Sequence, residues 1–151
     1  TNGHTVSDLL EKLGDLGELI QTDNPVPEAP GSFCFLVDHH WWKLTIPVDS
    51  SISNDPIQSL DVAILERLVL HPIFGIEDVR MDPRIDFVGG IRGTAELERL
   101  CIAGHFAVAI SMYPTTLDQL MAVSDAGEIM PPKSTWFEPK LRSGLLVHTL
   151  E

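Results

Sequence analysis

The sequence predicts one α+β domain in which helices pack on a mixed β-sheet. Its 151 residues fit a single domain, and 44% of them are hydrophobic, which is enough for a core. Two β-prone runs flank a short polar turn in the first half of the chain, as the strands of a hairpin do. Residues 85–123 have the order strand, helix, strand, helix, which favours one parallel pair inside the sheet.

The first half of the chain should hold a helix, a short strand and the hairpin. Thr5 or Ser7 can cap the helix, and Gly14 can end it. The three prolines that follow the short strand indicate a loop. The expected elements are a helix over residues 6–13, a strand over 16–22, a loop over 23–31, and a hairpin of strands 32–37 and 41–46.

The second half should alternate helices with strands. Ser59 can cap a helix that Pro72 stops, and Thr116 with Gln119 fits a capping box. Gly104 has the place of a residue that ends a helix. The expected elements are helices over 59–70, from Thr94 and over 116–123, strands over 85–88, 106–112 and 145–150, and a loop over 125–144.

Composition narrows the classes of function. Ten Lys and Arg against 22 Asp and Glu give a net charge of −12, which disfavours nucleic acid as a partner of this domain. No apolar run reaches the ~20 residues of a membrane span, and no signal peptide is visible. Cys34 and Cys101 lie in apolar patterns, so we expect reduced thiols in a cytoplasmic protein. Because the chain begins at Thr1 without a Met and enters a helix almost at once, we expect an N-terminal part to be missing.

The first candidate site is the glycine-rich run DFVGGIRGT over residues 86–94, between an expected strand and an expected helix. Glycines let backbone N–H groups approach an anion, a helix N-terminus adds partial positive charge, and Arg92 could supply a bidentate fork. The spacing matches neither the P-loop nor the dinucleotide fingerprint. Two interpretations stay open: an anion site built on Gly89, Gly90 and Arg92, or a tight turn whose glycines adopt positive φ angles.

The second candidate is the loop PPKSTWFEPKLRSG over residues 131–144. Three of the ten basic residues fall here beside one acid, which reverses the sign of the chain locally. Its prolines reduce the entropy that would be lost on binding. The alternative is a surface loop that packs through its aromatic residues and leaves its charges solvated. The side chains suited to a phosphate or carboxylate are Lys133, Ser134, Thr135, Lys140 and Arg142.

The spacing of the histidines and of the aspartates does not match a metal site, and no cofactor is expected. His39 and His40 are neighbours in the hairpin, so their side chains point to opposite faces and converge poorly on one ion. Asp78, Asp82 and Asp86 lack the glycine and terminal Glu of an EF-hand loop. Asp86, beside the glycine turn, is a candidate catalytic acid or base.

Three stretches resemble the bacterial family called domain of unknown function 1015. They are DP at 55–56 with SLD at 59–61, RIDFVGGIRG at 84–93, and the long run at 121–144 that contains PPKSTWFEPKLRSG. The resemblance extends from about Ser32 to the end and is looser before it. Family members are longer, so the chain resembles their C-terminal part. Their His-His-Arg motif lies upstream, and it is not carried over because His40 here is followed by Trp41.

The resemblance implies a function beyond what the residues alone indicate. Members are sometimes labelled as similar to the ParB or SpoOJ chromosome-partitioning proteins, and a distant kinship to the ParB and sulfiredoxin fold would agree with nucleotide binding and phosphotransfer. The leading hypothesis is an enzyme-type protein that binds a phosphometabolite or nucleotide, with this domain and its own missing N-terminal domain as the walls of the site. The alternative is a ParB-like regulatory or scaffold module without catalysis that docks partners or forms a homodimer.

Overall fold

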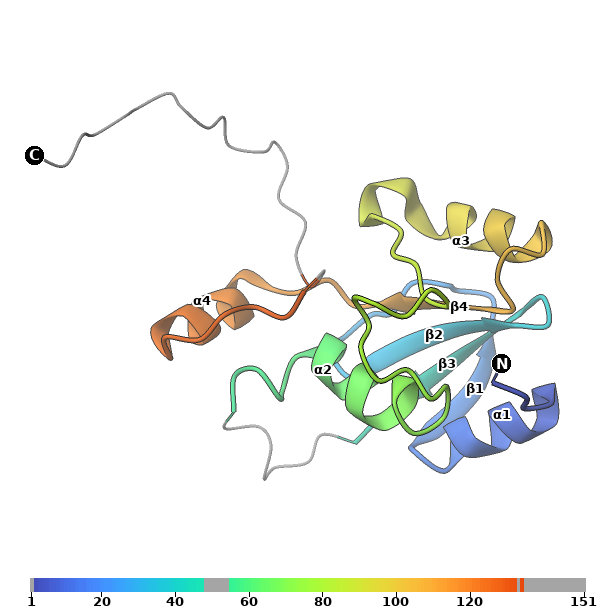
Figure 1. The fold of residues 1–151 in the computed structure, drawn as a ribbon, viewed down its shortest axis with the longest axis horizontal. Helices are drawn as coiled ribbons and strands as arrows, with labels where there is room; N and C mark the ends of the chain where they lie inside the picture. The colour runs from blue at the N-terminus through green and yellow to red at the C-terminus, as the bar shows by residue number, and fades with distance from the viewer. Residues whose placement is uncertain (1, 48–54, 133, 135–151) are drawn as a thin grey trace, which may run out of the picture.

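A computed structural model describes residues 2–47, 55–132 and 134 of the chain. In these residues a four-stranded antiparallel sheet has the strand order β1-β3-β2-β4 (Figure 1). The α+β class is therefore confirmed, but the parallel pair expected inside a mixed sheet is wrong. The strands are β1 (Glu18–Thr22), β2 (Ser32–Val37), β3 (His40–Thr45) and β4 (Val108–Met112).

Residues 85–88 do not form the expected strand. They run as irregular chain into the short 3₁₀ helix η2 (Gly90–Arg92), and Phe87 is left exposed. The reason is topological: the helices before this segment pack on one face of the sheet and the helix after it packs on the other. The segment carries the chain from one face of the sheet to the other without joining the sheet.

Two capping boxes mark the helices whose starts were well predicted. Thr5, not Ser7, caps the first helix through Asp8, and Thr116 caps the last through Gln119 as expected. Gly104 adopts φ 74, which fits its expected place after a helix. The helices are α1 (Val6–Gly14), α2 (Asp61–Leu65) with its π-helical continuation η1 (Glu66–Leu70), α3 (Gly93–Ile102) and α4 (Leu117–Asp125).

The hairpin of β2 and β3 forms the centre of the sheet. Asp38 and His39 both have positive φ, at 47° and 64°, and they connect the paired residues Val37 and His40. Positive φ at both central residues is the geometry of a two-residue turn that matches the twist of antiparallel strands. The predicted hairpin is therefore confirmed, and its tip leaves His39 exposed.

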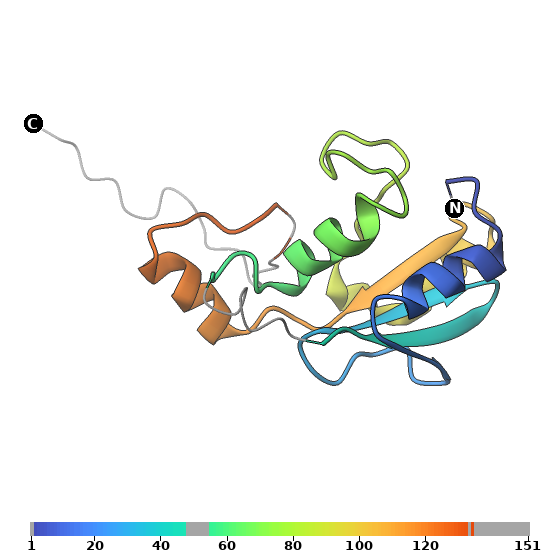
Figure 2. The same ribbon diagram turned by 90° about the horizontal axis from the view of Figure 1, so that it is seen from below.

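Alternate side chains of β2 enter two apolar clusters, one on each face of the sheet. Phe33 and Phe35 join the larger cluster with residues of α1, α2 and η1. Cys34 and Leu36 point the other way and lie in a smaller cluster that α3 covers. Figure 2 shows α1 in front of the sheet, with α3 largely hidden behind the strands. Every residue of β2 is consequently buried, as in a central strand covered on both faces.

Candidate functional site

The glycine-rich stretch forms a short 3₁₀ turn that leads directly into α3. Gly89 has an ordinary φ of −62°, whereas Gly93 lies in the left-handed region at φ 66°. A Cβ added at Gly90 or Gly93 would meet no heavy atom within 4 Å, so open space surrounds the turn. Of the two interpretations from sequence, positive φ therefore holds for Gly93 but not for Gly89. Nothing in the turn requires Gly90 to be glycine for packing.

The N-terminus of α3 carries no side-chain cap. The residue in the cap position is Arg92, which makes no capping hydrogen bond, and Thr94 does not act as the expected cap. The first N–H groups of a helix have no partner inside the helix, but the preceding 3₁₀ turn supplies one here, since the N–H of Gly93 donates to the carbonyl oxygen of Gly90. Asp86 lies upstream and exposed, and one of its carboxylate oxygens accepts a hydrogen bond from the N–H of Phe87 at 2.8 Å.

Charged side chains extend along the outer face of α3. Arg99 binds Glu96 through two hydrogen bonds, from Nε at 2.7 Å and from Nη2 at 2.8 Å. Arg92 approaches the same carboxylate only to 3.9 Å, and its side chain is 68% exposed. The pKa of Glu96 is held below its usual value, chiefly by the hydrogen bond from Arg99. Glu96 is thus an ionised carboxylate that engages Arg99 closely and Arg92 loosely.

The start of the second candidate stretch lies near the end of β4. The hydroxyl of Thr115, just beyond β4, donates to the carbonyl oxygen of Ser134 at 2.9 Å, and the hydroxyl of Ser134 donates to the carbonyl oxygen of Pro131 at 2.6 Å. A short connection joins α3 to β4, and the two pack together, so α3 begins at the end of the sheet where β4 finishes (Figure 1). Ser134 and the Arg92 turn are therefore at the same end of the sheet.

The remaining members of the second candidate lie outside the described residues. These are Lys133, Thr135, Lys140 and Arg142, together with the strand expected over 145–150.

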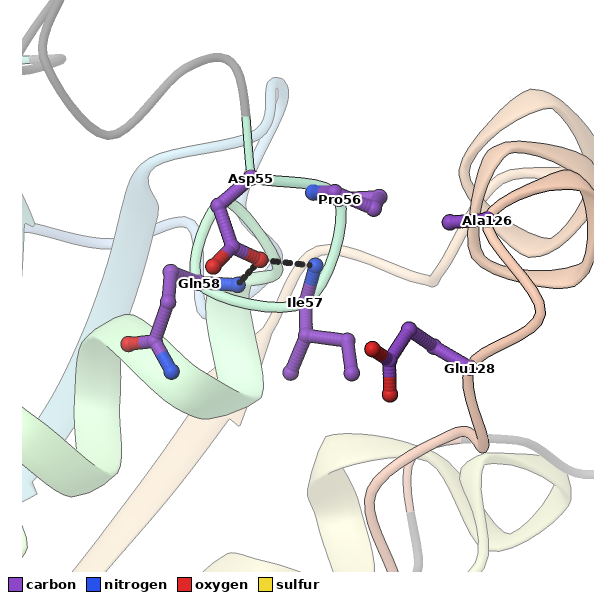
Figure 3. A pocket seen from close by; sticks show the side chains of 6 residues that line it. All are labelled: Asp55, Pro56, Ile57, Gln58, Ala126 and Glu128. Atoms are coloured by element: carbon purple, nitrogen blue, oxygen red, sulfur yellow. Dashed lines mark hydrogen bonds between the residues drawn. The ribbon is translucent and has the colours of Figure 1, made fainter.

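A hollow of about 360 Å³ lies between the turn before α2 and the end of α4 (Figure 3). One carboxylate oxygen of Asp55 accepts hydrogen bonds from the N–H groups of Ile57 and Gln58, at 2.9 and 3.0 Å, and this holds the turn. The charged groups in the lining are both acidic, so the hollow is unsuited to an anion. Its lining residues, none of them a predicted site residue, are Asp55, Pro56, Ile57, Gln58, Ala126 and Glu128.

One polar group that the residue patterns did not single out is the buried carboxylate of Asp61 at the start of α2. Its Oδ1 accepts a hydrogen bond from the N–H of Gly31 at 2.8 Å, and its Oδ2 is buried without a partner in the described part of the chain. Burial raises the pKa of Asp61, and the hydrogen bond from Gly31 acts in the opposite direction. The only sequence signal for this residue was its place in the stretch at 59–61 that resembles a known family.

Both cysteines are free thiols, with Cys34 buried and Cys101 half-buried, and burial raises the pKa of each. Both belong to the apolar packing between the sheet and α3. In residues 2–47, 55–132 and 134, no three His, Cys, Asp or Glu side chains come together as metal ligands. In the same residues, no helix has the length and apolarity needed to cross a membrane.

Comparison with protein-family models, curated proteins and solved structures finds no match to this chain. The resemblance to the domain of unknown function 1015 consequently depends on the three stretches quoted above.

Proposed function

We propose that this domain forms one wall of a site for a phosphorylated small molecule, either a phosphometabolite or a nucleotide. The observation that carries the proposal is the uncapped N-terminus of α3 with the exposed guanidinium of Arg92 beside it. Helix N–H groups and a guanidinium are both donors suited to phosphate. The open space around Gly90 and Gly93 leaves room for a ligand to approach the backbone.

The position of Ser134 supports a contribution from the second stretch. Because Ser134 is fixed near the end of β4, the chain enters its basic stretch at the end of the sheet where α3 begins. Lys133, Lys140 and Arg142 lie outside the described residues, and their part in the same site stays a prediction from the sequence. The resemblance of both stretches to one family agrees with a shared role.

The chemistry of such a site would require the N-terminal part of the longer protein. The described residues of this domain offer hydrogen-bond donors and positive charge to a ligand. Among them, Asp86 is the acid for which the sequence suggested a role in proton transfer. The domain would therefore contribute binding, orientation and charge stabilisation to a phosphate group. A phosphotransfer reaction would take its catalytic residues and second substrate from the other wall.

A second function, a docking module, is favoured by apolar side chains that face solvent. Leu117 and Met121 lie one turn apart on α4, and others flank α3, where a partner or a second copy could cover them. The exposed large apolar residues are Val6, Ile20, Val26, Met81, Phe87, Ile91, Ile102, Leu117, Met121 and Ile129.

The proposal is tested by the melting temperature of the chain in phosphate, ATP, ADP and phosphoserine, with serine as the ligand that lacks phosphate. A ligand at tenfold excess over its Kd adds about 1.4 kcal/mol, which raises the melting temperature by roughly 3–6 °C in a chain of this size. Arg92→Ala should remove the rise.

Arg80→Ala is the matched control, because Arg80 is similarly exposed at 65% but pairs with Asp78 on another loop. A rise that Arg80→Ala preserves and Arg92→Ala removes supports the proposal. If no phosphate compound raises the melting temperature, or if both variants behave alike, the anion site is wrong. Dimerisation in light scattering that Met121→Lys abolishes would then favour the docking module.

A further inference from the structure

One side of α4 leaves apolar side chains exposed. Leu117 is 70% exposed and Met121 is 53% exposed, and residues four positions apart lie on the same side of a helix. The buried residue of α4 is Val123, and the helix lies beyond the end of the sheet (Figure 1). Neither Leu117 nor Met121 belongs to the two apolar clusters. Because a helix is stabilised chiefly by burying its apolar side, this side of α4 lacks a partner in the described part of the chain.

The chain returns to the start of α4 at Ser134. Thr115 lies just before the helix, and its hydroxyl donates to the carbonyl oxygen of Ser134 at 2.9 Å. Leu117 follows Thr115 by two positions, and Trp136 follows Ser134 by two positions. Two residues of chain span at most about 7 Å. The hydrogen bond therefore places the indole of Trp136 within reach of the side chain of Leu117.

The residues that follow Ser134 match the exposed side of α4 in chemistry. The run TWFEPKLR over residues 135–142 has two adjacent aromatic residues, and its two cations outnumber its single acid. The charged residues of α4 and of the chain around it, over 114–132, are all acidic, and opposite charges favour the approach of two surfaces. These acids are Asp118, Asp125 and Glu128.

We propose that the side of α4 with Leu117 and Met121 is the docking surface for residues 135–142 of the same chain, which pack on it through Trp136 and Phe137. The inference goes beyond the proposed function and does not rest on it, because it uses no contact of α3. It assigns to the chain itself the apolar surface of α4 that a docking module would offer to another protein.

Tethering favours this segment over a separate partner. A segment joined to its surface by a short connection has an effective concentration on the order of millimolar. The connection here is short, because the hydrogen bond from Thr115 holds Ser134 directly before the segment. A second copy or another protein would therefore have to bind α4 more tightly than the segment does in order to replace it.

The test uses the whole chain with 5-fluorotryptophan, whose fluorine NMR signals report on the three tryptophans separately. The Trp136 signal, assigned with Trp136→Phe, should lie apart from its position in urea. Leu117→Ser should move it toward that position, because the substitution removes apolar surface from the docking site. Ile102→Ser is the matched control, since Ile102 is 71% exposed at the end of α3, and it should leave the Trp136 signal in place. Unchanged signals of Trp41 and Trp42 show that the variants are folded.

Amide exchange gives a second measurement. Trp136→Ala should speed exchange of the α4 amides by roughly three- to tenfold, because the helix loses an apolar contact that opposes its local opening. Unchanged exchange would overturn the inference. A Trp136 signal at its urea position in the wild type, or one that Leu117→Ser leaves in place, would overturn it as well. A Trp136 signal that moves with protein concentration would show that a second copy contributes the contact, and docking within one chain would be rejected.

Discussion

The indole nitrogen of Trp41 donates a hydrogen bond to a carboxylate oxygen of Glu98 at 2.8 Å, which joins β3 to α3 across 57 positions of the sequence. Trp41 is buried and Glu98 is half-buried, so a broken bond would leave the indole N–H without a partner. Glu98→Ala should lower the free energy of unfolding by about 1–3 kcal/mol in urea titrations. Glu98→Gln keeps an acceptor oxygen and should lose less. Equal losses in the two variants would contradict this account.

Two glycines close together in sequence should respond oppositely to alanine. A Cβ at Gly17 would overlap the carbonyl oxygen of Thr45, a backbone atom of β3 that cannot turn aside. Gly17→Ala should therefore cost about 1–3 kcal/mol, as overpacking does. Gly14 ends α1 with open space around it, so Gly14→Ala should gain up to about 1 kcal/mol through helix propensity. Thermal unfolding compares the pair, and a cost at Gly14 would count against the reasoning.

Asp61 should make stability depend on pH. Its pKa is raised in the folded state, so its contribution is fully present below the unfolded pKa of about 3.9 and is lost as pH rises through the folded value. Asp61→Asn keeps an oxygen for the N–H of Gly31 and does not titrate. The free energy of unfolding of the variant minus that of the wild type should therefore increase from pH 4 to pH 7. A difference that is constant with pH would show that the carboxylate is ordinary in the folded protein.

Replacing the two capping threonines should affect stability differently: one substitution should lower global stability and the other only the local stability of a helix. Thr5 begins α1, which buries Leu9 and Leu13 in the larger cluster, so Thr5→Ala should lower global stability by about 1 kcal/mol. Thr116 begins α4, whose one buried residue is Val123. Thr116→Ala should speed amide exchange within α4 and leave the urea midpoint nearly unchanged, because α4 can open alone. A matching fall in midpoint for both variants would mean that α4 unfolds with the rest.

Local patterns were enough to predict most of the elements. The hairpin followed from its β-prone runs, and the positive φ values of Asp38 and His39 now explain its tight turn. Both capping boxes are contained within four consecutive residues, so they can be recognised without tertiary information.

The pairing of the strands required information that local patterns lack. Residues 85–88 have the composition of a strand, yet no strand of the sheet pairs with them, and they carry the chain between the two faces as irregular backbone. The partner of β4 is β2, a strand far from it in the sequence, and α3 packs against β4.

For the candidate site, the sequence indicated which residues have suitable side chains, but it did not indicate which of these side chains contact one another. The glycine turn indicated Arg92, but nothing local indicated that Arg99 would take the carboxylate of Glu96. An acid such as Asp61 is common at the start of a helix. It is buried here because the segment around Gly31 packs against it. The approach of Ser134 to Thr115 is likewise a tertiary contact.

The central position of β2 has a consequence for the order in which the protein assembles. Its pairing with β3 closes over the turn Asp38-His39 and can form within microseconds, whereas its pairing with β4 has to close a loop that includes α2 and α3. We therefore expect the hairpin to exist for a time with the other edge of β2 open. That edge belongs to the run SFCFLV, which has no charge and no proline. The partly folded protein should therefore be more prone to aggregate than the native protein. Any partner that speeds the pairing of β4 with β2 should protect it.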